Sequence, residues 1–290
     1  MTLLEHLQAI NPNFLKFVIQ DIQDANALSI GVRCFGIEKD GTTFSGGTAS
    51  TSEIAKRIAI AEAFERSLID VVAKDEKLSK KFNMAYFPSS SGFASGFDRA
   101  STRFRAICEG LERWVWSKWI DEQYRLSPHP KNEVILNPLA AHLSSSFDEV
   151  FWYSKNFLLP ITLEENLPLT IIIFLGCKDN GIYPGSRVSR STDDLYTHPI
   201  IEAQRNYSNT QLNKVALPDD DIIKKRTFYF ANNKKQAFEQ ILKANIDSWP
   251  EPKLRLLEEL DTNITEVFLY RCLLENFMGW HLGPVNRFVY

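Results

Sequence analysis

Two short acidic–basic motifs are the most informative feature of the sequence. Residues 62–66 read EAFER and residues 109–113 read EGLER, so the pattern E-x-x-E-R occurs twice. Each copy lies in an otherwise apolar stretch with the character of a helix. Glutamates three residues apart project from one side of a helix, so each copy would direct two carboxylates toward one point. The repeated pattern predicts a site for a metal-bound polyphosphate.

The residues around the first motif strengthen this prediction. Residues 54–72 read IAKRIAIAEAFERSLIDVV, which is apolar almost all round and therefore predicts a largely buried helix. Buried carboxylates are costly without a cation or hydrogen bonds, and two arginines cannot neutralise four glutamates. Magnesium, which prefers carboxylate and phosphate oxygens, is the natural counter-ion. Four alanines would leave room beside the acids: Ala55, Ala59, Ala61 and Ala63.

An alternative interpretation needs no ligand. Both motifs could be solvated faces of amphipathic helices that carry intrahelical pairs between glutamate and arginine.

The elements that position the motifs follow a repeated order. Residues 28–38 and 42–48 indicate two strands joined by a turn, and residues 51–73 indicate a long helix. Hairpin and helix return in the same order over residues 168–212. Three pairs of residues match at one constant offset, which supports an internal duplication: Asp40 with Asp179, Gly46 with Gly185, and Ser50 with Ser189. We therefore expect an α+β fold, internally duplicated, with layered antiparallel β hairpins covered by helices.

The rest of the chain is less informative. A small-residue loop at residues 89–96 (SSSGFASG) precedes the helix of the second motif and could present backbone N–H groups to an anion. Residues 234–246 and 253–260 suggest surface helices, and residues 267–277 suggest a last strand.

Composition narrows the function classes. The 290 residues are 44% hydrophobic and 24% charged, as is ordinary for a globular protein, and the net charge of −3 without a basic stripe argues against a nucleic-acid role. The first residues form neither a signal peptide nor a membrane anchor, so we expect a cytoplasmic protein with no membrane partner. The four cysteines are scattered without a C-x-x-C, which favours buried reduced thiols over zinc or disulfides.

Taken together, four segments resemble the YcaO-type ATP-dependent cyclodehydratase family. They are residues 46–66 (GGTASTSEIAKRIAIAEAFER), 89–96, 108–113 (CEGLER) and 202–205 (EAQR). The resemblance runs in order over about residues 28 to 210. It implies a single YcaO-like domain over residues 1–290.

The resemblance also implies an ATP site in which the two E-x-x-E-R helices hold magnesium against the triphosphate. By this carry-over the metal ligands are Glu62, Glu65, Glu109 and Glu112. The residues expected to contact the nucleotide, or to orient these ligands, are Arg66, Ser91, Arg113, Glu202, Gln204 and Arg205. The cofactors would be ATP and Mg²⁺.

The chemistry implied is activation of a peptide backbone amide by ATP. The amide oxygen attacks the γ-phosphate, a nucleophile attacks the activated carbon, and phosphate leaves. A Cys, Ser or Thr side chain of the substrate gives an azoline, whereas sulfide gives a thioamide. The expected partners are a peptide or protein substrate and a protein that delivers either the leader of that substrate or sulfur. A homodimer is a further option.

Three departures from the family pattern leave other functions open. An acid common in the family is replaced by Ser101, for which Asp98 could substitute. A lysine is missing at residues 46–48, and the N-terminal nucleotide-contacting segment is short or absent, although Lys16 could stand in. A YcaO-fold scaffold subunit without turnover is therefore the alternative to the enzyme, and a magnesium-nucleotide enzyme acting on a small molecule is a third reading.

Overall fold

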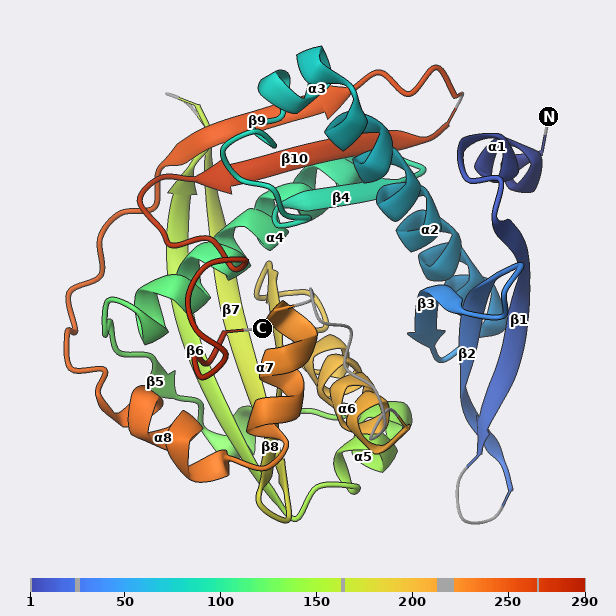
Figure 1. Ribbon diagram of the computed structural model, residues 1–290. Coiled ribbons are helices and arrows are strands. Elements are labelled where there is room, and N and C mark those ends of the chain that lie inside the picture. Colours follow the sequence, from blue (N-terminus) through green and yellow to red (C-terminus); the bar gives the residue numbers. More distant parts are fainter. Residues whose placement is uncertain (1, 24–26, 163–164, 213–221, 265, 290) are drawn as a thin grey trace. The chain divides into compact units, whose positions relative to one another are not determined.

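The computed structural model describes residues 2–23, 27–162, 165–212, 222–264 and 266–289 (Figure 1). The chain divides into two compact units. Unit 1 comprises Met1–Ile107 and Leu256–Cys272, and unit 2 comprises Cys108–Arg255 and Leu273–Tyr290. The boundary falls within helix α4 (Arg99–Ile120), so this one helix contributes to both units. The expected single domain over residues 1–290 stays a prediction.

Unit 1 is built on a three-stranded antiparallel sheet of order β1-β2-β3. A second sheet has the order β4-β10-β9, in which β4 and β10 are antiparallel. The elements of this part of the chain are α1 (Leu3–Ile10), β1 (Phe14–Gln23), β2 (Ser29–Glu38), β3 (Thr43–Ala49), α2 (Ser52–Lys74), α3 (Glu76–Lys81), β4 (Phe93–Gly96), β9 (Leu254–Leu260) and β10 (Phe268–Leu274). Its core gathers aromatic and aliphatic side chains, among them Phe14, Phe64, Phe82 and Leu269.

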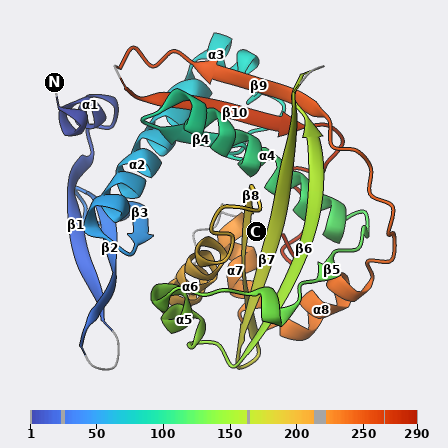
Figure 2. The ribbon, with the colours of Figure 1, turned by 180° about the vertical axis from the view of Figure 1, so that it is seen from behind.

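Unit 2 is built on an antiparallel sheet of order β5-β6-β7-β8, with α6 packed against β8 and β7 (Figure 2). Its elements, besides the second half of α4, are β5 (Ser127–Pro128), the 3₁₀ helix η1 (Lys131–Glu133), α5 (Pro138–Ser144), β6 (Glu149–Pro160), β7 (Asn166–Lys178), β8 (Gly181–Ser189), α6 (Thr197–Leu212), α7 (Ile222–Phe230) and α8 (Lys234–Leu242). Strand β7 is almost continuously buried, which agrees with its run of apolar residues.

The predicted hairpin-and-helix order occurs in both units, as β2-β3-α2 and as β7-β8-α6. In each unit a glycine lets the helix backbone approach the hairpin. A Cβ atom at Gly47 would lie 2.1 Å from the carbonyl oxygen of Ala55, and one at Gly185 would lie 2.0 Å from that of Pro199. At Gly46 the nearest such contact is 3.8 Å. The strand registers of the two hairpins match at the expected constant offset, since Gly46 pairs with Phe35 and Gly185 pairs with Phe174. The helix backbone approaches a different glycine in each hairpin, Gly47 in the first and Gly185 in the second.

Helix α2 is not buried all round. Its alanines and Phe64 pack inward, but Ile54 and Ile58 are 49% and 41% exposed. The alanines bring the helix close to neighbouring backbone: Gly47 meets Ala55, and the Ala61 carbonyl accepts a hydrogen bond from Ser95. Room for a ligand beside the acids stays a prediction.

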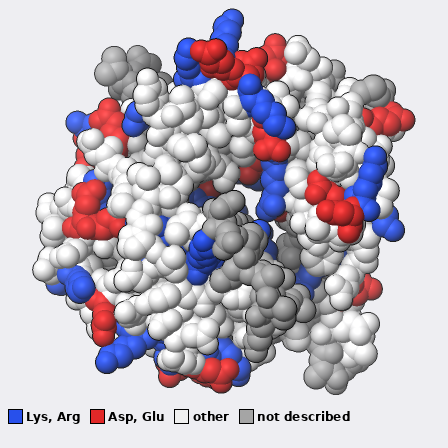
Figure 3. All heavy atoms as spheres, viewed as in Figure 1, with Lys and Arg blue, Asp and Glu red and all other residues white. Residues whose placement is uncertain are grey.

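The surface and the cysteines agree with a globular chain. On the face shown in Figure 3, acidic and basic side chains are interspersed. All four cysteines are buried free thiols. None of the helices in the described parts of the chain combines the length and the apolar character that a membrane span requires.

Candidate functional site

The first E-x-x-E-R motif lies on α2 in unit 1, where both carboxylates bind backbone groups. Glu62 accepts a hydrogen bond of 2.9 Å from the Gly46 N–H, and Glu65 accepts one of 3.1 Å from the Ser95 N–H. Glu62 also pairs with Arg66 at 2.7 Å, and the Arg66 side chain is 51% exposed. This copy therefore contains the intrahelical Glu–Arg pair of the alternative interpretation, and it fastens the β3 and β4 strands to the helix.

The small-residue segment before α4 is not an open loop. Residues 93–96 form β4, and the Ser95 N–H, carbonyl and hydroxyl all have partners. Gly92 has φ of +79°, and a Cβ there would lie 1.8 Å from the Cys272 carbonyl oxygen. The small residues of β4 thus serve close packing between strands, and anion binding by the segment stays a prediction.

Ser91 is buried in the same segment. Its N–H donates to the Ser89 hydroxyl at 3.3 Å, and its carbonyl accepts from Arg271 at 3.3 Å. These contacts indicate a structural role for the Ser91 backbone. Contact between Ser91 and nucleotide stays a prediction.

Asp98 caps the start of α4. Its carboxylate accepts a 2.8 Å hydrogen bond from the Ser101 N–H, three residues on, which holds the pKa of Asp98 below its usual range. Both Asp98 and Ser101 are exposed. The geometry accounts for Asp98 without a metal.

We therefore expect Asp98→Ala to lower the free energy of unfolding, because the cap is lost. Asp98→Asn should cost much less, since asparagine caps helices equally well. Denaturant unfolding of the two variants measures this difference. If Asp98→Asn instead weakened magnesium-nucleotide binding at unchanged stability, the carboxylate would be a ligand after all.

The second motif lies in unit 2 and is far more buried. Arg113 donates to Glu109 through Nε at 2.7 Å and lies 2.6 Å from the same carboxylate through Nη2. The same guanidinium lies 3.8 Å from Glu112, whose exposed fraction is only 6%. Burial first, and then the charge of Glu109, hold the pKa of Glu112 well above its usual range.

Helix α6 brings a third carboxylate to this motif. Glu202 accepts a 2.9 Å hydrogen bond from the Ser186 N–H, and burial raises its pKa although Arg205 and Arg113 oppose the shift. Glu202 in turn raises the pKa of Glu112. We call the residues Glu109, Glu112, Glu202 and Arg113 the acidic cluster. The expected association of the late helix with the second motif is thus present.

Gln204 lies elsewhere. Its side-chain oxygen accepts a 2.8 Å hydrogen bond from the Ser146 hydroxyl, and residues two apart point to opposite sides of a helix. The structure does not bring Gln204 to the acidic cluster, whereas Arg205 acts on Glu202 electrostatically.

The donor set suits a hard cation without forming a closed cage. Glu112 is buried, whereas Glu109, Glu202 and Arg113 are partly buried and Arg205 is exposed. Among these five residues the acids outnumber the arginines by three to two. Within the described residues, no group of three or more His, Cys, Asp or Glu side chains is arranged to hold a metal ion. Magnesium commonly binds through one or two carboxylates together with water and phosphate oxygens, so a closed cage is not required. The meeting of the two motifs at one metal stays a prediction.

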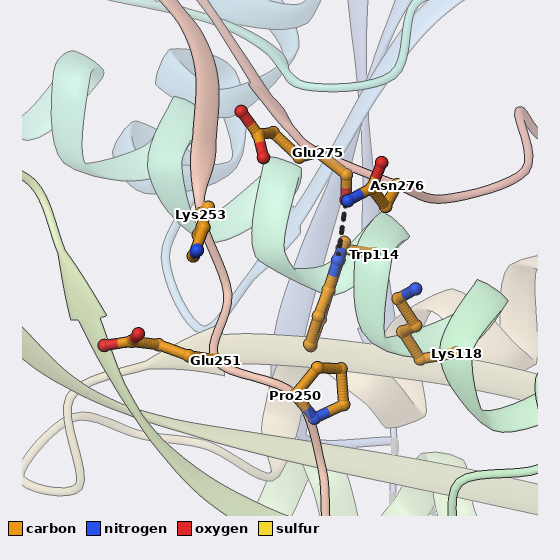
Figure 4. A pocket seen from close by; sticks show the side chains of 7 residues that line it. All are labelled: Trp114, Lys118, Pro250, Glu251, Lys253, Glu275 and Asn276. Carbon is orange, nitrogen blue, oxygen red and sulfur yellow. Dashed lines mark hydrogen bonds between the residues drawn. The ribbon is translucent and has the colours of Figure 1, made fainter.

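A separate cavity of about 310 Å³ lies on the opposite side of α4, where Trp114 and Lys118 project (Figure 4). The rest of its lining consists of Pro250, Glu251, Lys253, Glu275 and Asn276. Trp114 donates through Nε1 to the carbonyl oxygen of Glu275 at 3.0 Å. Charges of both signs line this cavity, and none of its lining residues belongs to the acidic cluster.

Sequence reasoning missed three buried arginines that organise the structure, namely Arg226, Arg271 and Arg287. A signal exists for Arg271, because it interrupts the apolar run of a predicted strand. Trp280, which contacts Arg113, gives no such signal.

Comparisons with known proteins show which solved structures have a similar fold. No protein-family model matches the sequence, and neither does any curated protein. The structure of YcaO from Methanopyrus kandleri bound with AMPPCP and Mg²⁺ is 10% identical with a TM-score of 0.51, and the match covers 94% of this chain and 90% of that chain. A chain of the E. coli microcin synthetase McbBCD complex with pro-MccB17 bound is 11% identical with a TM-score of 0.60, and 90% and 88% are covered. A heterocyclase in complex with substrate and cofactor is 12% identical with a TM-score of 0.55, over 96% of this chain and 52% of that chain. The predicted YcaO-like α+β fold is confirmed.

Proposed function

We propose that this chain, which has the fold of the YcaO proteins, binds ATP and Mg²⁺ and activates a backbone amide of a peptide or protein substrate. The observation that carries the proposal is the acidic cluster, in which burial and mutual repulsion hold the pKa values of Glu112 and Glu202 above their usual range. Such a cluster gains stability from a cation. The similar YcaO structure bound with AMPPCP, an ATP analogue, and Mg²⁺ supports this choice of ligand.

The chain's own residues would bind and orient. Glu109 and Glu112 would hold the metal from the second motif, and Glu62 and Glu65 would hold it from the first. Arg113 would keep the carboxylates of the second motif in place, while Arg66 and Arg205 are exposed enough to reach phosphate. ATP, when bound, supplies the phosphoryl group that turns the amide oxygen into a leaving group.

The expected reaction needs positioning more than it needs an enzyme nucleophile. The substrate supplies the amide oxygen, and either a substrate side chain or sulfide supplies the second nucleophile. Charge neutralisation and alignment are what the motif residues can offer. This agrees with the cysteines, since burial raises the pKa of Cys108 and Cys177 to about 12 and leaves them poor nucleophiles.

A partner is part of the proposal. The McbBCD structure is a complex with pro-MccB17 bound, which supports a peptide substrate and partner subunits for a chain of this fold. We infer that this chain works with a protein that delivers the substrate leader or sulfur.

The scaffold subunit remains the second candidate because two observations favour it. Ser101 is exposed and occupies the place of an expected acid. In the first motif, Glu62 and Glu65 already accept hydrogen bonds from the backbone N–H groups of Gly46 and Ser95.

Calorimetry with ATP and Mg²⁺ tests whether the protein has the nucleotide site that both candidate functions are expected to use. We expect binding at micromolar to millimolar ATP that disappears when magnesium is chelated. A folded sample that gives no heat at millimolar ATP would contradict both the ATP-dependent enzyme and any nucleotide-binding scaffold.

Turnover is then tested with a cognate peptide and its partner. Phosphate release should rise when the peptide is added, and the peptide should lose one water or exchange one oxygen for sulfur. Binding without turnover in any pairing would favour the scaffold, and phosphate release with an unchanged peptide would leave a plain ATPase.

A further inference from the structure

The C-terminal segment, residues 275–289, is fastened along the second half of α4. At its start, Glu275 accepts a hydrogen bond from Trp114 (Figure 4). Further on, the Met278 N–H donates to the Ser117 hydroxyl at 3.0 Å. Both contacts lie within unit 2, so the segment and the helix that carries the second motif are tied together directly.

Two buried arginines hold this segment in its folded course. Arg226, on α7, donates to the carbonyl oxygens of Trp280 at 2.5 Å and Leu282 at 2.6 Å. Arg287 donates to the Gly279 carbonyl at 2.7 Å and to Asp121 of unit 2 through Nε at 2.8 Å. Charge-assisted hydrogen bonds of this kind are about twice as strong as neutral ones, so this part of the segment is rigidly held.

The rigid segment places Trp280 against the acidic cluster. The Trp280 side chain is 5% exposed, and its ring centroid lies 3.7 Å from the guanidinium carbon of Arg113. Its Nε1–H also points at the Arg113 carbonyl oxygen, at 3.4 Å. The guanidinium is therefore stacked on the indole while its N–H groups bind Glu109.

We propose that Trp280 is a positioning residue, which confines the Arg113 guanidinium so that it stays in register with Glu109 and Glu112. An arginine side chain has several rotatable bonds, and a stack on an aromatic face removes that freedom before any ligand arrives. The stack also leaves the guanidinium edge available to the carboxylates. The confinement of the Arg113 guanidinium by Trp280 does not depend on a bound ligand. Its effect on nucleotide affinity rests on the proposed function.

The test observes Arg113 directly, by NMR of protein labelled with ¹⁵N-arginine and in the absence of nucleotide. The Arg113 Nε–H signal, assigned by its loss in Arg113→Lys, should be shifted by the indole ring current and protected from exchange with water. In Trp280→Ala this shift and protection should vanish, and in Trp280→Phe most of the protection should return because a ring face is kept. Trp249→Ala is the matched control, since that tryptophan makes tilted ring contacts with Trp114 and Tyr124, and it should leave the signal unchanged.

Magnesium-nucleotide affinity is the second readout. We expect Trp280→Ala to weaken it about tenfold and Trp280→Phe by no more than about threefold, at a temperature where all variants are folded. An unchanged Arg113 signal in folded Trp280→Ala would overturn the proposal, as would equal losses in Trp280→Ala and Trp249→Ala. If the wild-type protein bound no nucleotide, the proposed function would fail, while the Arg113 signal would still decide whether Trp280 is a positioning residue.

Discussion

Replacing Glu112 by glutamine is expected to abolish magnesium-dependent nucleotide binding and, at the same time, to raise the free energy of unfolding at neutral pH. Glu112 is buried beside Glu109 and Glu202, so its negative charge is unfavourable in the ligand-free fold. Glutamine keeps the shape and removes the charge. The affinity should fall by about a hundredfold or more, because a metal ligand and its charge are lost together.

The pH dependence of stability has a definite sign. Burial raises the pKa of Glu112 in the folded state, so the folded protein binds this proton more tightly than the unfolded chain does. Its contribution to stability is fully present below the unfolded-state pKa, ordinarily about 4.5, and is lost as pH rises through the raised folded-state pKa. The advantage of Glu112→Gln over wild type should therefore grow over this window.

Denaturant unfolding at several pH values, combined with calorimetry, measures both effects. Glu239→Gln is the control, because Glu239 is an exposed acid on α8 whose ion pair with Lys235 is 4.0 Å long. It should change neither quantity. A Glu112→Gln protein that is destabilised at neutral pH would show that the carboxylate is structural, and an unchanged nucleotide affinity would exclude Glu112 as a ligand.

The two copies of E-x-x-E-R show which features of the candidate site the sequence alone predicts. Their spacing correctly indicated helices, and both arginines do pair with the glutamate four residues before them. The same motif residues nevertheless have different environments, since the side chain of Arg66 is 51% exposed and that of Arg113 is 16% exposed. Tertiary packing against α6 and the C-terminal segment causes this difference in exposure. The local sequence around each motif does not predict it.

Strand β9 is an element whose type the sequence predicted wrongly. Residues 254–260 read LRLLEEL, and these strong helix formers favoured a helix. They form a strand because β10 offers its hydrogen-bonding edge, which overrides local propensity. In contrast, the hairpins were predicted correctly, since turn residues and apolar runs act over short distances.

Replacing Arg271 by methionine is expected to have the largest effect on stability. Arg271 lies in unit 1, is fully buried on β10, and binds four backbone carbonyls at 2.6–3.3 Å, those of Phe82, Phe87, Ser89 and Ser91. Desolvation lowers the pKa of Arg271 to about 10, so the side chain remains a cation at neutral pH. One guanidinium thus organises the whole segment that leads into β4.

Methionine would fill much of the same volume while leaving these carbonyls without their donor. Each unsatisfied buried polar group costs about 1–3 kcal/mol, so the summed loss should exceed about 3 kcal/mol, enough to open residues 82–92 or to unfold unit 1. The ring of Phe93, 4.6 Å from the guanidinium, would lose its cation as well. Lysine should rescue little, because a single ammonium cannot reproduce the fork of donors.

Hydrogen exchange resolved by residue distinguishes the two forms of this loss. Local opening should expose the amides of residues 82–92 and leave β2 and β3 protected, whereas unfolding of unit 1 should expose all of them together. Arg99→Met is the matched control: the exposed Arg99 pairs with Glu259, and loss of this surface ion pair should change the stability far less than Arg271→Met does. If Arg271→Met cost no more than Arg99→Met, the carbonyls would have to find other donors, and the segment before β4 would not depend on the buried guanidinium.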